Sequence, residues 1–365
     1  MESNIRIVDH SETDIEHLLN NFNVFFTNNY SQYLISNDNP ERTLLADSVI
    51  IIDEQVYNLY KNNHLFQNID KKRIIPIIAL EHNKTLDSAL FIYNKLTELK
   101  ADKYTQIIAI GGGIICDIAS FIAATFYRGT KILLIPTTLL AQCDAAIGGK
   151  NGVNFNHIKN AIGTIRQANS IIIDINFLQT LPINHISNGF AEIIKIAAIR
   201  DIELFKQLQN IDFPDIFSNV NELNNIIKKA IYNKLQIVAE DENEKGLRRI
   251  LNFGHTIAHS LESVYGISHG RAVAIGMKYA TQFSVNKYQS DTTIIEQMNN
   301  ILMKFNLIDN NFKIEIDKIF DFIAADKKKE KDILHFVILN KIGQAEQVKI
   351  KLNELKEELN ALHNN

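Results

Sequence analysis

The pattern of apolar and polar residues in the first half of the chain predicts buried strands that alternate with helices. Between the strands, apolar residues recur at intervals of three and four, which is typical of helices packed on a core. Strands are expected at 48–53, 73–80, 106–110 and 131–140, and helices at 85–101 and 114–129. Strand, turn and helix repeat over the first 175 residues, which favours a parallel sheet with covering helices.

The pattern changes after the apolar stretch 170–182. From 187 to 310 almost every segment has helical period, with one short strand expected at 333–340 and a charged amphipathic helix at 349–365. We therefore predict an α/β protein with a domain boundary near Leu181 and Pro182. A Rossmann-like parallel-sheet domain is expected over 1–181, followed by a mostly α-helical domain over 182–365.

Composition and charge restrict the class of protein. With 46% hydrophobic and 22% charged residues, the chain has the balance of a soluble globular protein. Its net charge of −4 gives no overall attraction for nucleic acid, so local basic groups must meet any anionic ligand. The N-terminus does not resemble a signal peptide, and no run approaches the roughly 20 apolar residues of a membrane span. Cys116 and Cys143 are expected to be buried reduced thiols of a cytoplasmic protein.

Three glycines follow the strand expected at 106–110 and precede a helix. Glycine in this position lets a phosphate group approach the backbone N–H groups at the positive end of the helix dipole. The segment AIGGGIICD at 109–117 is not the complete G-x-G-x-x-G fingerprint. A nucleotide-binding turn and a tight turn without a ligand both fit the motif, and the strand–turn–helix context favours the nucleotide.

Polar groups concentrate after the strand expected at 131–140. The segment PTTLLAQCDAAIGGKNGVN at 136–154 contains Asp144, Lys150 and Asn154, and Lys159 and Asn160 follow closely. A surface turn would explain Gly-Gly-Lys by itself. The density of hydroxyl, ammonium and amide groups favours a binding site for a polar ligand.

An apolar helix expected at 188–199 carries Glu192 and Lys195, which are three residues apart and so share a face. A surface salt bridge is the simplest interpretation of such a pair. Apolar neighbours on all sides instead indicate a buried helix, where charges are normally paired or bound to a metal.

Three histidines lie close together in LNFGHTIAHSLESVYGISHG at 251–270. A single histidine is usually a core residue, but three of them with a buried carboxylate fit a catalytic metal site that keeps one open position. Spacing alone favours His255 and His259 as a ligand pair on one helix, with His269 after a short turn. The spacing also predicts that Arg248 and Asn252, behind Glu244, extend the same polar stripe along a single helix face.

These motifs, in this order over about residues 45–350, resemble the 3-dehydroquinate synthase family of sugar-phosphate cyclases. The segments that carry the resemblance are GGGIICDIASFIAATFYRG, PTTLLAQCDAAIGGKNGVN, KNAIG, GFAEIIK, EKGLRRILNFGHTIAH, HGRAVAIGM and DKKK. The resemblance implies NAD as a catalytic cofactor, zinc with cobalt as an alternative metal, and a metal-binding role for the helical domain.

Residue by residue, the resemblance implies Glu192, His255 and His269 as the zinc ligands, which leaves His259 to contact the substrate phosphate or support a ligand. It maps the NAD site to Asp53, Glu81, Lys84, Gly112, Gly113, Asp117, Thr137, Thr138, Lys159, Phe177 and Thr180. It maps substrate contacts to Asp144, Lys150, Asn160, Lys195, Lys234, Glu244, Arg248, Asn252, His259 and one of Lys327 and Lys328. Arg128 would reach the substrate phosphate of a neighbouring subunit, which implies a homodimer.

The implied reaction converts 3-deoxy-D-arabino-heptulosonate 7-phosphate to 3-dehydroquinate and phosphate. A substrate with a carboxylate and a phosphate suits the local lysines and arginines of an otherwise acidic chain. In the family reaction, NAD is reduced and reoxidised within one turnover, phosphate leaves by elimination, and an aldol step closes the ring. The resemblance therefore implies a lyase of the shikimate pathway of aromatic amino-acid biosynthesis, with no net redox change.

Three residues depart from the family pattern. Arg271 stands where glutamate is common, Asn151 where threonine is common, and Arg166 lies in IRQA where FYQP or FWQP is common. None of these changes removes an implied ligand, but the two arginines are candidates to adjust substrate choice.

Three alternatives follow from the same residues. Related cyclases act on sedoheptulose 7-phosphate or glucose 6-phosphate and do not need the carboxylate contacts expected of Lys150, Arg248 and Asn252. A metal-dependent polyol dehydrogenase would not need these lysines and would release NADH. A catalytically inactive relative would have lost a metal ligand or a lysine, and the sequence retains them all.

Overall fold

The computed structural model describes residues 12–35, 47–67, 69–156, 158–213, 215–309, 312, 314–327 and 333–363. The chain divides into two compact units, residues 11–182 and 183–365. Each unit has its own core and is described by itself.

A six-stranded sheet forms the centre of the N-terminal unit, with strand order β1-β8-β5-β4-β2-β3. All neighbouring strands are parallel. Its strands are β1 Val24–Thr27, β2 Val49–Asp53, β3 Ile74–Ile77, β4 Ile107–Gly111, β5 Ile132–Pro136 and β8 Ser170–Asp174. The predicted strands β2 to β5 are confirmed. Strand β1 was not predicted, and β8 lies in the apolar stretch 170–182, to which no strand was assigned.

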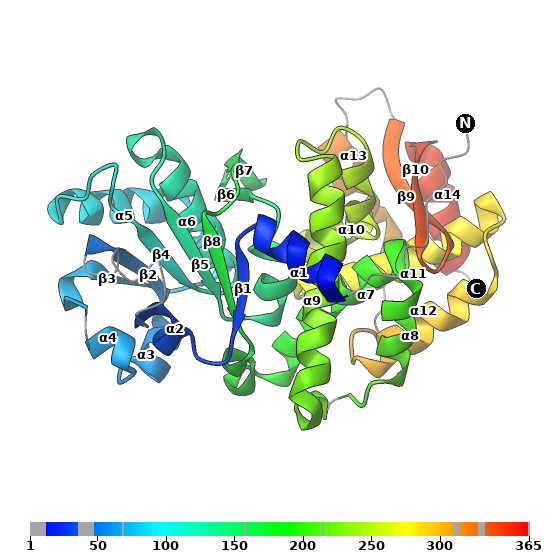
Figure 1. Ribbon diagram of the computed structural model, residues 1–365. Coiled ribbons are helices and arrows are strands. Elements are labelled where there is room, and N and C mark those ends of the chain that lie inside the picture. The colour runs from blue at the N-terminus through cyan, green and yellow to red at the C-terminus, as the bar shows by residue number, and fades with distance from the viewer. Residues whose placement is uncertain are drawn as a thin grey trace. The chain divides into compact units, whose positions relative to one another are not determined.

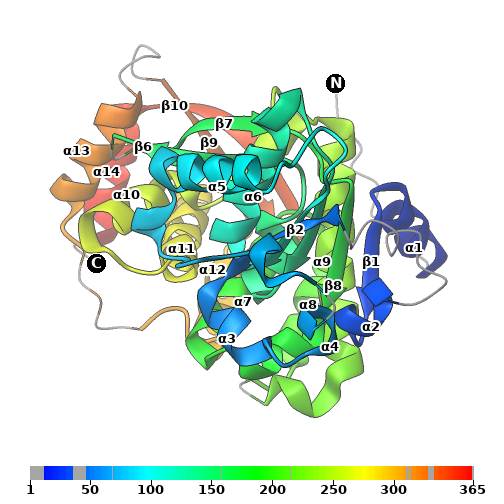
Figure 2. The same ribbon diagram turned by 90° about the vertical axis from the view of Figure 1, so that its left-hand side faces the viewer.

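Helices cover both faces of this sheet, with α5 and α6 on one face and α2, α3 and α4 on the other (Figures 1 and 2). The helices of the unit are α1 Glu12–Asn21, α2 Tyr30–Ile35, α3 Glu54–Tyr60, α4 His64–Gln67, α5 Leu86–Glu98 and α6 Gly113–Thr125. Because both faces are covered, β4 and β5 are buried along their whole length. Cys116 and Cys143 are both buried, and neither forms a disulfide bond.

An antiparallel hairpin of β6 Lys150–Phe155 and β7 Ile158–Ile165 lies beside helix α6. The strands approach each other so closely that a Cβ atom at Gly163 would lie 2.2 Å from the carbonyl oxygen of Asn151. The sequence analysis predicted a polar ligand site here but no strands.

The helical unit consists of α7 Ile183–Arg200, α8 Ile202–Asn210, α9 Val220–Glu240, α10 His255–Tyr265, α11 His269–Tyr288, α12 Thr293–Lys304, α13 Ile316–Lys327 and α14 Leu352–His363. Helix α11 packs against α7, α10 and α12. None of the helices in the described part of the chain is long and apolar enough to cross a membrane.

A hairpin of β9 Ile333–Lys341 and β10 Gln344–Lys351 packs on α11 and α7. Strand β9 confirms the strand expected at 333–340. The helix expected at 349–365 begins only at Leu352, because residues 349–351 pair with β9 as the end of β10.

Candidate active site

Three side chains that could together hold a metal ion, each from a different helix, meet in the helical unit. Glu192 lies on α7, while His255 and His269 are the first residues of α10 and α11. Their candidate ligand atoms all lie within 4.8 Å of one another. The Nε2 atoms of His255 and His269 are 3.6 Å and 3.3 Å from Oε1 of Glu192. One carboxylate and two imidazoles form a donor set typical of a catalytic zinc site.

Close helix crossings at glycines bring these side chains together. A Cβ atom at Gly270, next to His269, would lie 2.4 Å from the Cα atom of Asn188 on α7. A Cβ atom at Gly276 of α11 would lie 2.1 Å from the carbonyl oxygen of Gly254, which precedes His255. Only glycine permits backbones to approach this closely. The close contacts of α11 with α7 and with the start of α10 therefore bring the two histidines to Glu192.

The charge of Glu192 is fixed by its surroundings. Its side chain is 2% exposed and forms an ion pair with the equally buried Lys195. Burial alone would raise the pKa of Glu192, but the Lys195 ammonium and the two histidines hold it well below its ordinary value. The Glu192 carboxylate is therefore held in its charged form and could serve as an anionic ligand.

Each histidine of the cluster is oriented through its second ring nitrogen. Nδ1 of His255 donates to the carbonyl oxygen of Phe253 at 3.2 Å, so Nε2 faces Glu192 as an acceptor. Nδ1 of His269 lies 3.3 Å from Oε1 of Glu262, whose side chain is 8% exposed. Carboxylates in this position fix the ring orientation and raise the basicity of a metal-binding histidine. The sequence analysis missed Glu262, although it lies three residues after His259 on the buried side of α10.

Replacing Glu262 by glutamine is expected to lower zinc affinity about 10–100-fold, because the amide lacks the charge that makes His269 a strong ligand. Competition with a chromophoric chelator measures this change. Glu203→Gln is the matched control, since Glu203 forms an exposed pair with Lys206 on α8. Equal zinc affinity of the Glu262 and Glu203 variants would contradict a role for Glu262.

Zinc binding at about neutral pH is expected to release one proton. Burial lowers the pKa of His255 to about 3, so this ring is already neutral. Burial would also lower the pKa of His269, but its hydrogen bonds to Glu192 and Glu262 raise it to about 10. Zinc must displace that proton, so zinc affinity should rise about tenfold per pH unit up to the pKa of His269 and then level off.

Calorimetric zinc titrations in two buffers of different ionisation enthalpy count the released protons. A zinc affinity that does not change between about pH 6 and pH 8 would show that zinc does not displace a proton from His269.

His259 does not belong to this cluster of ligand atoms, and its ring centroid lies 5.5 Å from that of His255. The predicted single polar stripe is wrong, because Arg248 and Asn252 lie in a separate 3₁₀ helix, Leu247–Asn252. Gly254 has a φ of +78° and breaks the chain direction before α10 begins. The break follows from the close crossing with α11.

The other predicted substrate residues of the helical unit are held by their own contacts. The Asn252 amide donates to Oε1 of Glu244 at 2.7 Å, and Nη1 of the buried Arg248 donates to the carbonyl oxygen of Glu242 at 2.6 Å. Lys234 is buried on α9. Lys327 ends α13, and Lys328 lies outside the described residues.

In the N-terminal unit, the predicted nucleotide residues follow the carboxyl ends of the parallel strands. Asp53 ends β2, Gly112 and Gly113 follow β4, and Thr137 and Thr138 follow β5. A Cβ atom at Gly112 would lie 3.1 Å from the methyl group of Thr138, so a side chain here would crowd the turn. Ligands of open parallel sheets bind outside this edge, where connections diverge, as they do between β2 and β4.

A buried lysine links predicted nucleotide and substrate residues. Nζ of Lys84 forms an ion pair with Asp117 of α6 and donates to Oδ1 of Asn160 at 2.5 Å. Burial raises the pKa of Asp117, although Lys84 opposes this shift. The Asn154 amide donates to Oε1 of Glu81 at 2.8 Å and accepts from the backbone of Asn160, which is left-handed at φ +52°.

The remaining predicted residues of this unit lie in three further places. Phe177 is buried against Tyr30 and Tyr60, and the Thr180 hydroxyl lies 3.3 Å from that of Tyr60. Asp144 lies in the π-helical turn Ala141–Ala145 that follows β5. Lys150 and Lys159 lie on β6 and β7.

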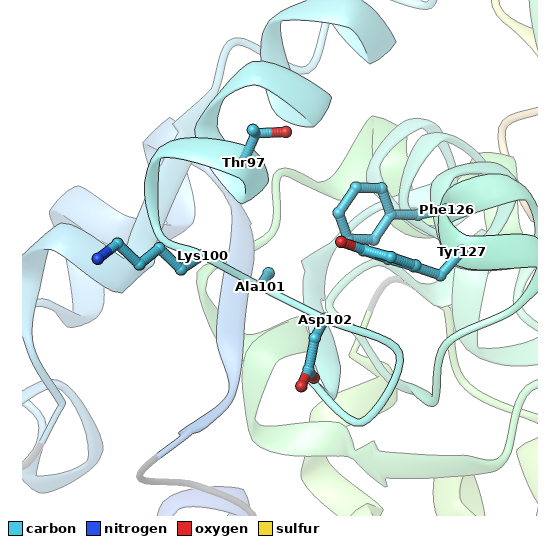
Figure 3. A pocket seen from close by; sticks show the side chains of 6 residues that line it. All are labelled: Thr97, Lys100, Ala101, Asp102, Phe126 and Tyr127. Atoms are coloured by element: carbon cyan, nitrogen blue, oxygen red, sulfur yellow. The ribbon is translucent and has the colours of Figure 1, made fainter.

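Arg128 lies in a sharp segment at the C-terminal end of α6, residues 123–130, which we call the Arg128 corner. It contains a 3₁₀ turn, Phe126–Arg128, and the Arg128 side chain is exposed. Phe126 and Tyr127 also form one side of an open pocket of about 400 Å³, and Thr97, Lys100, Ala101 and Asp102 form the other (Figure 3). None of the predicted site residues lines this pocket.

Both arginines that depart from the family pattern form contacts with other groups of the protein. Arg271 forms an ion pair with Asp309 and lies over the ring of Phe312 at 5.0 Å. Arg166 donates to backbone carbonyl groups at both ends of the Arg128 corner.

Two family models match the chain. One, described as 3-dehydroquinate synthase N-terminal, matches residues 74–188, and the other, described as 3-dehydroquinate synthase C-terminal, matches residues 189–329. Together they span most of both units. The chain belongs to the 3-dehydroquinate synthase family.

Relatives named 3-dehydroquinate synthase agree with this membership. The enzyme of Enterococcus faecalis is 37% identical over 318 residues, which cover 85% of this chain and 88% of the relative. The enzyme of Saccharolobus solfataricus is 35% identical over 326 residues, or 87% and 89% of the two chains. The identity therefore spans both units.

A solved structure with the same two-unit fold belongs to a related cyclase. It is 2-epi-5-epi-valiolone synthase from Streptomyces hygroscopicus subsp. jinggangensis 5008 with NAD+ and Zn2+ bound, with a TM-score of 0.83 and 25% sequence identity. The alignment covers 100% of this chain and 99% of that one. This chain thus shares its fold with a synthase whose solved structure holds NAD+ and Zn2+.

Proposed function

We propose that this protein is a 3-dehydroquinate synthase that converts 3-deoxy-D-arabino-heptulosonate 7-phosphate to 3-dehydroquinate and phosphate. The observation that carries the proposal is the cluster of Glu192, His255 and His269, within 4.8 Å, beside a buried lysine. It occurs in a chain of this family that also retains the lysines and arginines an anionic substrate needs. The enzyme would be a phosphate-eliminating lyase of the shikimate pathway.

The residues present fit a divalent metal. Glu192 is anionic, His255 is neutral with Nε2 available, and His269 gains a ligand lone pair on losing one proton. Three protein ligands leave a fourth position for a substrate oxygen, as catalytic zinc sites require. Zinc is the proposed metal, and cobalt suits the same donors.

The N-terminal unit fits NAD. Helix α6 has 13 residues and begins directly after the glycine turn, so its first N–H groups can meet a pyrophosphate. Asp53 ends β2 at the same edge of the sheet, where a carboxylate can accept the hydroxyl groups of a ribose. We propose NAD in this position, with the eleven residues implied by the family resemblance as its contacts.

In this proposal, NAD supplies a transient oxidation of a substrate hydroxyl, and the metal supplies electrostatic stabilisation of the developing oxyanion. The chain's own residues hold the substrate and its charges. Lys195 holds Glu192 in its charged form and is proposed to contact the substrate. Arg248, Asn252 and Lys150 are proposed to bind the carboxylate, since guanidinium, amide and ammonium groups donate to it.

Substrate comparison tests the proposal. Purified zinc-loaded protein with NAD+ is expected to release phosphate rapidly from 3-deoxy-D-arabino-heptulosonate 7-phosphate, and not from sedoheptulose 7-phosphate or glucose 6-phosphate. NADH should not accumulate and its absorbance should not rise, because the cofactor is reoxidised in each turnover.

Two outcomes would replace the proposal. Phosphate release only from a substrate without a carboxylate would identify another cyclase with the same fold. NADH that accumulates as substrate is consumed would indicate a dehydrogenase.

We further propose that the enzyme is a cytoplasmic homodimer. The family resemblance gives Arg128 a contact with the substrate phosphate of a neighbouring subunit, and its side chain is exposed, as such a contact requires. Sedimentation equilibrium at micromolar protein measures the mass, and a monomer that turns over substrate at the full rate would contradict the proposal.

A further inference from the structure

The guanidinium group of Arg166 ties together the two ends of the Arg128 corner. Its Nη1 donates to the carbonyl oxygen of Ala123 at 2.6 Å, and its Nη2 donates to that of Thr130 at 2.7 Å. Ala123 lies in the last turn of α6, and Thr130 lies shortly before β5. The Arg166 side chain therefore joins the first and last residues of the corner.

The corner has a conformation that needs such support. Tyr127 and Arg128 both have left-handed backbones, with φ of +49° and +63°, and Gly129 has a φ of +130°. Left-handed residues other than glycine are unfavourable, and two in succession persist only when surrounding contacts hold them. Strain of this kind at an exposed arginine points to a function for its placement.

A planar guanidinium group suits both carbonyl groups at once. It presents two donors in a fixed fork, and its positive charge is favourable at the C-terminal end of helix α6. Gly129 leaves room for it, because a Cβ atom there would lie 3.3 Å from Nη1 of Arg166. Glycine at 129 and arginine at 166 therefore fit each other.

The backbone of Arg166 is anchored at the β6–β7 hairpin. Its N–H donates to the carbonyl oxygen of Gly149 at 2.8 Å, directly before Lys150. A Cβ atom at Gly149 would lie 2.9 Å from the carbonyl carbon of Arg166, so the two backbones are in close contact. Arg166 thus links the hairpin that carries Lys150 and Asn160 to the corner that carries Arg128.

We propose that Arg166 is a positioning residue that holds Arg128 in the left-handed conformation in which it meets the phosphate of a substrate bound to a second copy of this chain. The inference rests on the proposed function, since it gives Arg128 its ligand. The arginine that replaces the family's aromatic residue thereby serves substrate binding without touching the substrate.

Hydrogen exchange in the free protein tests the first half of the inference. In Arg166→Gln, the amides of Gly129 and Thr130, which donate to Phe126 and Ala123, are expected to exchange at least about tenfold faster. The matched control is Arg73→Gln, because Arg73 also donates to a backbone carbonyl group of this unit, that of Asp47 at 2.9 Å. Unchanged exchange in Arg166→Gln would overturn the inference.

Kinetics test the second half. Arg166→Gln is expected to raise the KM for 3-deoxy-D-arabino-heptulosonate 7-phosphate about tenfold or more, with a smaller change in kcat, and Arg166→Lys, which keeps one donor, should be intermediate. The double variant Arg128→Gln/Arg166→Gln should be no worse than Arg128→Gln alone. Effects that multiply in the double variant would overturn the inference, because they would show that Arg166 acts independently of Arg128.

A second variant covers the case in which Arg166→Gln does not fold. Gly129→Ala keeps Arg166 but strains the backbone at its φ of +130° and crowds the guanidinium group, so it should loosen the corner and reproduce both the faster exchange and the higher KM. Wild-type exchange and KM in Gly129→Ala would overturn the inference. Absence of phosphate release by the unmodified protein would overturn the proposed function, and the exchange data would still decide whether Arg166 holds the corner.

Discussion

Replacing His255 by alanine is expected to leave the purified protein with little bound zinc and without measurable turnover. His255 supplies one of the three ligand atoms that lie within 4.8 Å of one another. Loss of a residue that merely supports a ligand costs about 10–100-fold in metal affinity, so loss of the ligand itself should cost more than about 100-fold. Chelator competition gives the affinity, and phosphate release gives the turnover.

His259→Ala is the matched control, because the same residue type is removed four residues later on the same helix. This variant should retain zinc and turn over slowly, since His259 is proposed to contact the substrate and not the metal. Zinc loss in both variants would restore the ligand pair of His255 and His259 that sequence spacing favours. Zinc retained in His255→Ala would show that His255 is not a ligand.

Strands β2 to β5 could be predicted because strands that are buried on both faces appear in the sequence as continuous runs of apolar residues. Val49 to Ile52, for example, are fully buried between helices, so each position is apolar. The hairpin β6–β7 was missed for the opposite reason. Its second strand, β7, is largely exposed, so its sequence resembles a polar loop. Strand β1, Val24–Thr27, is apolar at three of its four positions but is so short that periodicity cannot tell it from part of a helix.

The residue types of the candidate site could be predicted, but their grouping could not be derived from spacing. Spacing treats Arg248 to His259 as one helix, whereas the chain breaks at Gly254 because α11 approaches its backbone. The contact between Gly254 and Gly276 joins residues far apart in the sequence, so the local periodicity of apolar residues cannot predict it. The same limit hid the contacts of Glu262 and Arg166, which depend on where α11 and the Arg128 corner lie.

Replacing Lys84 by methionine is expected to destabilise the N-terminal unit by about 3 kcal/mol near pH 8, because breaking a buried ion pair leaves an uncompensated charge. The side chains of Lys84 and Asp117 are 6% and 18% exposed. Burial already raises the pKa of Asp117, and loss of the lysine should raise it further. A raised carboxyl pKa destabilises the folded state as pH rises through it, so the defect should shrink as the pH is lowered toward 5.

Urea unfolding at several pH values measures this defect, and calorimetric titration with NAD+ should show a parallel loss of affinity. Lys95→Met is the matched control: Lys95 pairs with Glu98 on α5 with both side chains exposed, so its loss should cost less than about 0.5 kcal/mol at every pH. Lys84→Met/Asp117→Asn removes both charges and should recover part of the stability but not the NAD affinity. Equal stability of the Lys84 and Lys95 variants at pH 8 would show that the ion pair does not support the fold. Full NAD affinity in the double variant would show that Lys84 and Asp117 serve the fold alone.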